Sequence, residues 1–338
     1  CAEKLSHWVE VMSVDGAAWQ EVVMETFSTL PDVCTTQQLQ DALIRTCNDK
    51  KTEATQLMAG HLYLGGVYKA CYGDSSAIPA LIDFYREMVY LGYWEDMGYT
   101  YEELLSLDNV LNHSKDSDYT YSQLSQIVGK YSVQNRVEGT LLESPQFTFM
   151  RMALGCAKAE QVSETKLTDV EAWYYYFSHS QAINAPTPNY VNLGTKSRGY
   201  ASCCLIKAND TAPSIATATL IADQMTCASA GIGHQLTSRS LGDAVRGGVI
   251  EHNGKLPYLR ALQSAVHANV QGSRGGSATT YLTPNDPEIF SLLKARSVTT
   301  VAEKRVGGID YNFGHVEEFR RRVAANEDWY LFSYYRFL

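Results

Sequence analysis

Apolar residues recur at helical spacing through the first part of the chain, over residues 2–73. Leu5, Trp8, Val9 and Met12 follow one another at intervals of three, one and three residues. These intervals place the four side chains on one face of a helix. The pattern therefore predicts a chain that begins with packed amphipathic helices.

Local signals predict where some of these helices begin and end. Thr35 or Thr36 is expected to cap a helix, because a threonine oxygen can accept a hydrogen bond from a free backbone N–H. Gly73 is expected to end another helix. The polar segment 112–118 is expected to be a loop. Further helices are expected at 78–90, 99–107, 121–128, 144–156 and 170–177.

The character of the chain changes at Pro186-Thr187-Pro188. The segment 200–206 then has the composition of a short buried strand, and Asp210 is placed to cap the helix that follows. Helices are expected at 215–225, 257–270 and 287–294, a strand at 277–282, and glycine-rich or flexible segments at 231–254 and 271–276. Strands that alternate with helices after an all-helical region predict an α/β fold, with a barrel or open sheet in its second part.

Composition and charge narrow the class of protein. The chain has 338 residues, 45% of them hydrophobic, and a formal net charge of −9. This charge argues against nucleic acid or an anionic membrane as the main partner. The sequence has neither an apolar run long enough to span a bilayer nor a signal peptide pattern, so we expect a cytoplasmic protein.

Eight cysteines are scattered along the chain without a paired C-x-x-C spacing. A chain of this size needs no disulfide staples, so we expect free thiols in a reducing cytosol. Cys203 and Cys204 are adjacent on a predicted strand, and only one of them can face a given cavity. Taken alone, the pair is also compatible with two small buried side chains.

Three glycine-rich segments carry a possible binding chemistry, at 231–233, 245–250 and 271–278. Arg239, Arg246 and Arg274 lie in or beside them. Glycine lets a backbone approach a ligand closely, and arginine suits phosphate recognition. The composition alone leaves two alternatives, a nucleotide or phosphate site and ordinary turns with solvated arginines.

The order of these segments resembles the first half of the ten-stranded α/β barrel of class I ribonucleotide reductase large subunits. The matching elements are Pro-Thr-Pro at 186–188, Ser202-Cys203 on a strand, Asp210, and the three glycine-rich segments in sequence. Residues 130–136 (KYSVQNR) and 143–147 (ESPQF) resemble the helical domain of the same family. The resemblance divides the chain into a partial ATP-cone at 1–75, a helical domain at 76–183 and half of the barrel at 184–338.

The resemblance implies a role for individual residues. Cys203 corresponds to one of two cysteines that reduce the ribose 2′ position. The substrate would be held by Thr187, Ser202, Cys203 and Gly231, the first two at the diphosphate and the glycine at the ribose. The allosteric effector, ATP or a deoxynucleoside triphosphate, would be held by Asp210, Arg239 and Arg246, with Arg274 relaying effector identity. In the ATP-cone, Thr35 and Lys69 would contact ATP.

The resemblance also implies partners. No metal is expected in this chain, because the metal cofactor and its radical belong to the small subunit of the family. The radical cysteine, the second redox cysteine and the radical-path tyrosines lie outside this sequence, and residues 334–338 leave the family pattern. We therefore expect a companion chain carrying the C-terminal half, a small subunit, a second copy of the large subunit, and a thioredoxin or glutaredoxin type of reductant. An N-terminal Cys1 would also be compatible with intein splicing.

Two other interpretations stay open at this stage. The chain could be a catalytically inactive relative that binds nucleotides as a regulatory or assembly component. It could also be an unrelated phosphate-binding α/β enzyme, in which case the order of the motifs would be a coincidence.

Overall fold

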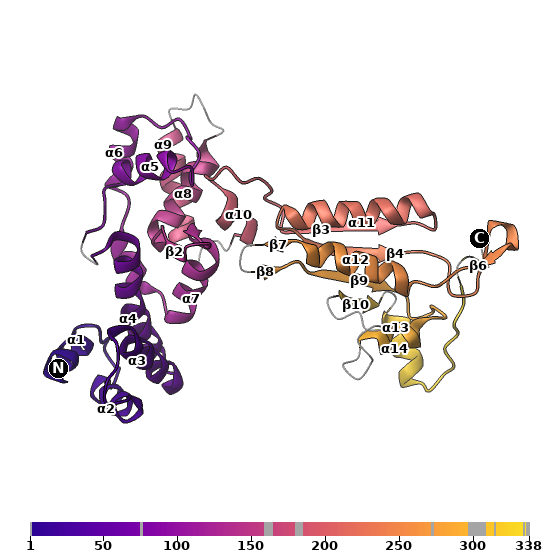
Figure 1. The fold of residues 1–338 in the computed structure, drawn as a ribbon, viewed down its shortest axis with the longest axis horizontal. Coiled ribbons are helices and arrows are strands. Elements are labelled where there is room, and N and C mark those ends of the chain that lie inside the picture. Colours follow the sequence, from indigo (N-terminus) through magenta and orange to yellow (C-terminus); the bar gives the residue numbers. More distant parts are fainter. Residues whose placement is uncertain are drawn as a thin grey trace. The chain divides into compact units, whose positions relative to one another are not determined.

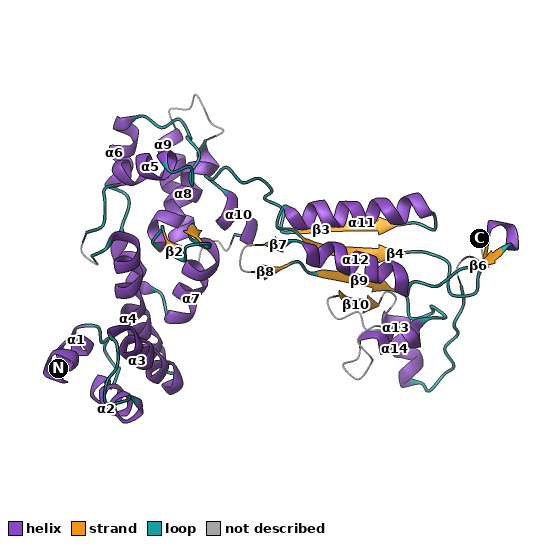
Figure 2. Ribbon diagram, in the orientation of Figure 1, coloured by secondary structure: helices purple, strands orange, loops and turns teal. Residues whose placement is uncertain are grey.

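The computed structural model describes residues 2–74, 77–158, 165–179, 185–271, 274–296, 309–313, 316–333 and 335. The chain divides into two compact units, Cys1–Arg198 and Gly199–Leu338. Figure 2 shows long helices in the first unit and the main parallel strands in the second. The predicted order of a helical region followed by an α/β region is confirmed. The three-part division at 75 and 183 stays a prediction.

In the described residues of the first unit, the elements are helical apart from one short strand pair, β1 (Gln134–Asn135) with β2 (Thr140–Leu141). Its remaining elements follow in chain order (Figure 1): α1 (Ala2–Val11), α2 (Trp19–Thr29), α3 (Thr36–Lys50), α4 (Glu53–Tyr72), α5 (Leu81–Tyr90), α6 (Tyr101–Asp108), the 3₁₀ helix η1 (His113–Asp118), α7 (Tyr121–Gln126), the π-helical turn η2 (Ile127–Tyr131), α8 (Pro145–Ala157), α9 (Lys166–Ser178) and α10 (Thr187–Asn192).

Two caps confirm local predictions in this unit. Thr35 is the N-cap of α3, where its side chain accepts from the Gln38 N–H and Gln38 returns a bond to the Thr35 N–H. This reciprocal pair satisfies two backbone donors that the helix leaves free. Gly73 ends α4 with a φ of 78°, a conformation that glycine adopts without steric cost.

The predicted loop at 112–118 is wrong. These residues form η1, and the carboxylate of Asp116 in it is fully buried. It accepts hydrogen bonds from Tyr68 Oη at 2.6 Å and from Gln146 Nε2 at 2.7 Å. The polar composition predicted a loop, but partners from α4 and α8 satisfy the buried oxygens of this helical segment.

Apolar packing in the first unit forms two clusters. One joins α1 to α4 around Leu43, Met58 and Leu62, all fully buried. The larger one joins α5 to α10, with Phe84 stacked on Phe147 at a centroid distance of 3.9 Å. The larger cluster packs α8 together with α10, the helix that begins at Thr187.

The second unit is built on one four-stranded parallel sheet of order β10-β9-β4-β3. Its elements in chain order are β3 (Cys203–Ala208), α11 (Ala212–Cys227), β4 (Gly231–Leu236), β5 (Ala244–Val245), the 3₁₀ turn η3 (Arg246–Gly248), β6 (Ile250–Glu251), α12 (Leu256–Ala268), β7 (Val270–Gln271), β8 (Arg274–Gly275), β9 (Ala278–Leu282), α13 (Ile289–Arg296), β10 (Ile309–Phe313) and α14 (Val316–Ala324).

Helices α11 and α12 run alongside the strands (Figure 1) and cover one face of the sheet. Alternate strand residues such as Ile206, Ile232 and Ala278 point into this core. The opposite face of β3, β4 and β9 is called the open face below. It consists of Cys203, Leu205, Lys207, Gly231, Gly233, Gln235, Thr279 and Tyr281.

The strand predicted at 200–206 begins three residues later than expected, at Cys203, and is buried on one side only. Leu205 on the open face is 80% exposed. The flexible turn predicted at 271–276 contains the antiparallel pair β7–β8, while Gly272 and Ser273 lie outside the described residues. The residues expected to leave the family pattern, 334–338, also lie outside the described residues, apart from Tyr335. Among the residues that the structure describes, no helix is long and apolar enough to cross a membrane.

Candidate functional site

Three of the predicted substrate residues meet at the amino ends of β3 and β4. Cys203 is the first residue of β3 and pairs in register with Gly231, the first residue of β4. The Gly231 N–H donates to the carbonyl of Ser202 at 2.7 Å, and the Ser202 hydroxyl donates to the Cys203 sulfur at 3.8 Å. The Cys203 side chain is exposed. This thiol therefore lies on the open face, next to a position without a side chain.

Cys204 faces the other side of the sheet. It is half-buried and packs against the core between the sheet and helices α11 and α12. The opposite orientations of Cys203 and Cys204 agree with the alternation of side chains along a strand. Of the two thiols, only Cys203 is available on the open face.

The open face is hollow where β4 carries glycine. At Gly233, a Cβ atom would lie 2.5 Å from Leu205 Cδ2, so a larger residue would displace that side chain. A cleft of about 360 Å³ lies over the face, lined by side chains that include Lys207, Gln235 and Tyr281. The face can therefore take up a ligand or further packed structure over Leu205, Gly233 and Tyr281.

A second polar group lies at the carboxyl ends of the same strands. Asp210 follows β3, and its two carboxylate oxygens accept from the Arg239 backbone N–H at 2.9 Å and from Arg239 Nε at 2.8 Å. This hydrogen bond raises the pKa of Arg239, so the guanidinium stays charged. The ring of Tyr335 lies 4.0 Å from the guanidinium carbon.

The expectation that Asp210 caps the next helix is wrong. Thr211 is the N-cap of α11, and its side chain accepts from the Ser214 N–H at 3.3 Å. The Asp210 carboxylate is directed to Arg239 instead. Aspartate and threonine can both cap a helix. Here Asp210 pairs with Arg239, 29 positions away in the sequence, and Thr211 is the cap.

Arg246 and Arg274 lie in separate parts of the second unit. Arg246 is exposed in η3, in the turn between β5 and β6, and has a positive φ of 52°. Arg274 lies on β8, paired in register with Gln271. Because β4 and β9 are parallel, α12 returns the chain to their amino ends, so Arg274 lies at the end of the sheet that holds Cys203. Asp210, Arg239 and Arg246 belong to the other end.

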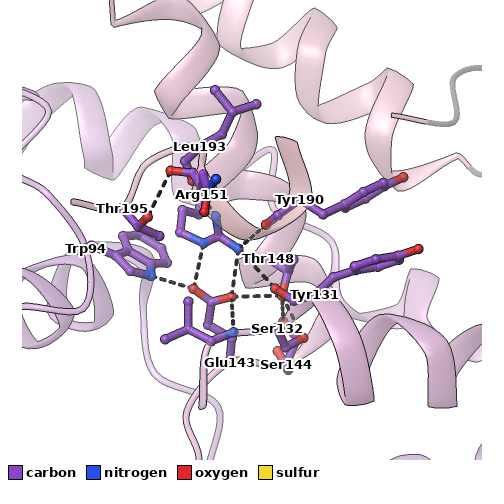
Figure 3. Close-up of polar contacts among 12 residues, drawn as sticks. Trp94, Tyr131, Ser132, Glu143, Ser144, Thr148, Arg151, Tyr190, Leu193 and Thr195 are labelled. Atoms are coloured by element: carbon purple, nitrogen blue, oxygen red, sulfur yellow. Dashed lines mark hydrogen bonds and ion pairs between the residues drawn. The ribbon is translucent and has the colours of Figure 1, made fainter. Parts of the chain in front are cut away.

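Thr187 is the first residue of α10 in the first unit, and a fully buried ion pair fixes the end of that helix. Arg151 on α8 bonds Glu143 through Nε at 2.8 Å, and neither side chain is exposed. The same guanidinium donates to the carbonyls of Tyr190 (2.8 Å) and Leu193. Figure 3 shows both carbonyls converging on Arg151.

Glu143 is fully satisfied in this network. It accepts from Trp94 Nε1 at 2.5 Å and from Thr148 Oγ1 at 2.9 Å (Figure 3). It also accepts from the Val133 N–H at 3.0 Å. The negative charge is thus balanced by Arg151 and by three further donors, as a buried carboxylate requires. The pair holds α10 on the scaffold of α8.

The predicted ATP-cone residues lie on α3 and α4. Thr35 is exposed, and its hydroxyl oxygen already serves as the α3 cap. Lys69 is exposed in the last turn of α4. The geometry thus gives Thr35 a structural role, while its role toward ATP stays a prediction. Among the described residues, no group of three or more histidine, cysteine, aspartate or glutamate side chains is placed to hold a metal ion.

Comparison with known proteins identifies the family. The family model for the ribonucleotide reductase barrel domain matches residues 201–336, and the model for the all-alpha domain of ribonucleotide reductase matches 117–198. Together they cover more than half of the chain. The chain belongs to the ribonucleotide reductase large-subunit family. Its second unit is therefore part of a ribonucleotide reductase barrel.

Curated relatives agree with this assignment. The chain is 32% identical over 306 residues to ribonucleoside-diphosphate reductase 1 subunit alpha of Escherichia coli, which covers 88% of this chain and 40% of the relative. It is 30% identical over 329 residues to the alpha subunit of Haemophilus influenzae, covering 95% of this chain and 43% of the relative. The alpha subunit of Enterobacteria phage T4 is 30% identical over 314 residues, with 90% and 41% covered. The chain thus spans about 40% of the length of these relatives.

Within this reductase fold, sequence reasoning missed the Glu143–Arg151 pair and the buried Lys255. Glu143 belongs to a segment that resembled the family, but nothing marked it as the partner of Arg151. The available signal was that Arg151 is the one charged residue in the helix 145–157. Such a charge is almost never fully buried without a partner.

Proposed function

We propose that this chain is a functional part of a ribonucleoside-diphosphate reductase large subunit, which reduces ribonucleotides to deoxyribonucleotides. The observation that carries the proposal is the exposed thiol of Cys203 on the open face of a reductase barrel, beside Gly231 and away from Cys204. Loss of the 2′ hydroxyl as water consumes two electrons and two protons, and two thiols supply them by forming a disulfide. Cys203 is the first of these thiols.

The second thiol must come from another part of the barrel. A disulfide requires Cα atoms roughly 4.4–6.8 Å apart, and Cys204 points to the opposite side of the strand. The exposed Leu205 and the unpaired outer edge of β10 in the described sheet favour further strands across the open face. We assign these strands, with the second thiol and the radical cysteine, to the C-terminal half of the large subunit.

Substrate binding would use Ser202 and Gly231 beside Cys203, while the role of Thr187 at the substrate diphosphate stays a prediction of the family resemblance. A serine or threonine hydroxyl can donate a hydrogen bond to a diphosphate oxygen. A small subunit with a metal cofactor would supply the radical that starts the reaction. A thioredoxin or glutaredoxin type of reductant would reopen the disulfide.

The effector site would use Asp210, Arg239 and Arg246, with ATP or a deoxynucleoside triphosphate as ligand. A carboxylate can accept hydrogen bonds from ribose hydroxyls, and arginines bind phosphate oxygens. Arg274 lies at the opposite end of the sheet from Asp210, Arg239 and Arg246. If Arg274 relays effector identity, it would have to meet an effector bound by another copy of the chain, which favours a homodimer. The outer side of α11 exposes Leu220 and Ile221, which suits a subunit interface.

The test is turnover in a complex that contains this chain, the C-terminal half of the large subunit, a small subunit and a dithiol. We expect conversion of ribonucleoside diphosphates, no turnover in Cys203→Ser, and most of the activity in Cys204→Ser. Turnover that survives Cys203→Ser would overturn the assignment of this thiol. Nucleotide binding without any turnover in the complete complex would instead favour a regulatory relative.

A further inference from the structure

A single carboxylate closes the base of the 237–255 loop, which leaves β4 with Arg239 near its start and holds Arg246 in its turn. Glu288 Oε2 accepts from the Leu241 N–H at 3.1 Å, and Glu288 Oε1 accepts from the Lys255 N–H at 3.0 Å. Leu241 and Lys255 lie on the outgoing and returning arms of the loop. Glu288 itself belongs to the connection between β9 and α13 and is buried. Glu288 therefore joins both arms of the loop to the connection between β9 and α13.

Lys255 completes a buried group that we call the loop-base cluster, consisting of Lys255, Asp286 and Glu288. Lys255 Nζ lies 2.8 Å from Asp286 Oδ2 and 3.7 Å from Glu288 Oε2, and its side chain is 4% exposed. Asp286 Oδ1 also accepts from the Glu288 N–H at 2.9 Å, which orders the two carboxylates.

The same ammonium reaches the start of the loop. Lys255 Nζ donates to the carbonyl of Arg239 at 3.4 Å and to the hydroxyl of Ser240 at 3.3 Å. Arg239 is thus held on both sides of its α-carbon, since its N–H donates to Asp210. The cluster therefore acts on the backbone that carries one of the phosphate-binding arginines.

The backbone at Gly254 is fitted to this arrangement. Gly254 has a φ of 81°, and a Cβ at this position would collide with Glu288 Oε1. A glycine permits both the left-handed conformation and the close approach of the carboxylate.

Two carboxylates buried against one lysine are expected to add little to the free energy of unfolding. Desolvation of such charges usually costs about as much as their attraction returns, and apolar replacements are often neutral or stabilising. The cluster has two carboxylates for one ammonium, and both Glu288 oxygens accept from N–H groups of the loop. Its contacts fit a role in holding a defined loop geometry better than a role in general stability.

We infer that Lys255 and Glu288 are positioning residues of the effector site, holding the 237–255 loop so that Arg239 and Arg246 meet the phosphates of a nucleoside triphosphate. This inference rests on the proposed effector site. Neither residue touches the nucleotide. Their effect should fall on recognition of the terminal phosphates rather than on the base or ribose.

The experiment compares ATP and ADP binding to the full chain by calorimetry at fixed ionic strength. The variants are Glu288→Gln, which loses the charge and one acceptor, and Lys255→Met. We expect ATP affinity to fall at least tenfold while ADP affinity falls less, so that the preference for ATP over ADP shrinks. Lys294→Met, an exposed lysine on α13, is the matched control and should keep the preference of the unmodified chain.

A general loss of folded protein would lower both affinities by the same factor and leave the ATP preference unchanged, which separates positioning from stability. Glu288→Asp covers the case in which the other variants fail to fold. It keeps the charge opposite Lys255, but it is too short to reach both the Leu241 and Lys255 N–H groups, so it should also lose the preference. Unmodified protein that binds neither nucleotide would overturn the proposed effector site. Binding with an unchanged preference in Glu288→Asp would overturn the positioning role alone.

Discussion

Asp210 and Arg239 form a paired unit at the carboxyl ends of two neighbouring parallel strands. The arginine donates to the carboxylate through both its backbone N–H and its Nε, at 2.9 and 2.8 Å. Both side chains stay partly exposed, at 33% for Asp210 and 24% for Arg239. A ligand can therefore reach the pair without unfolding the loop that carries it.

The Asp210→Asn variant separates the stability of this pair from its use in binding. Partly exposed ion pairs contribute about 0–1 kcal/mol, so the free energy of unfolding should change by no more than about 1 kcal/mol. Loss of a hydrogen bond to a charged group in the ligand site costs about 1.5–3 kcal/mol, so nucleoside triphosphate affinity should fall by roughly tenfold or more. Calorimetry and thermal unfolding measure the two quantities. The exposed Asp328→Asn serves as the control, and undiminished affinity in Asp210→Asn would move the effector site elsewhere.

Cysteine alkylation tests the register of β3. Cys203 is exposed and Cys204 is packed against the helix-side core, so iodoacetamide should modify Cys203 well before its neighbour. Burial raises the pKa of Cys47 and Cys71 to about 12 and that of Cys156 to about 11, which leaves little reactive thiolate. Peptide mass spectrometry over a time course locates each modification. Faster labelling of Cys204 than of Cys203 would show that the strand register is shifted by one residue.

The sequence predicted elements well where a few neighbouring residues determine them. The Thr35 cap with Gln38 and the stop at Gly73 depend on groups within four residues. The opposite orientation of Cys203 and Cys204 follows from the pleat of any strand. The family resemblance was carried by the order of several such local motifs, which the matching family models confirm.

Contacts between distant residues were beyond this kind of reasoning. Arg151 bonds Leu193 across 42 positions, and Glu288 bonds Leu241 across 47. No spacing rule joins such residues before the fold is known. The two wrong predictions have the same cause. Asp210 pairs with the distant Arg239 instead of capping α11. Asp116 is buried because its partners Tyr68 and Gln146 lie on two other helices.

The buried pair of Glu143 and Arg151 should be costly to break on one side. Arg151→Met leaves Glu143 without a counter-charge at a site with no exposure, and such changes cost about 3–5 kcal/mol. Amides of α10 should exchange faster as well, because Tyr190 and Leu193 lose their donor. Chemical unfolding and hydrogen exchange measure these effects.

Two comparisons make the Arg151 result specific. The double variant Glu143→Gln with Arg151→Met should be less destabilised than the sum of its single variants, because no buried charge is left. Arg198→Met breaks an ion pair with Glu95 in which the arginine side chain is 64% exposed, and should cost no more than about 1 kcal/mol. An Arg151→Met protein as stable as Arg198→Met would contradict the assigned role.

Asp116 gives the helical unit a pH-dependent stability whose sign follows from its burial. Desolvation raises the pKa of Asp116 to about 7, although hydrogen bonds from Tyr68 and Gln146 act against this rise. A carboxyl with a raised pKa binds its proton more tightly in the folded protein than in the unfolded chain, where its pKa is about 4. Its contribution to stability is therefore complete below pH 4 and is lost as the pH rises through 7. Between pH 5 and pH 8 the loss should be roughly 3 kcal/mol.

The measurement is the difference in unfolding free energy between the unmodified chain and Asp116→Asn, taken at several pH values from 5 to 8. Burial lowers the pKa of His113 and His234 to about 4, but both histidines titrate in both proteins and cancel in the difference. The difference should shift in favour of Asp116→Asn as the pH rises, because the amide cannot ionise. Asp118→Asn, which changes an exposed aspartate on the same 3₁₀ helix, is the matched control. A difference for Asp116→Asn that stays constant across this range would mean that Asp116 is ionised throughout, held by its two donors against the cost of burial.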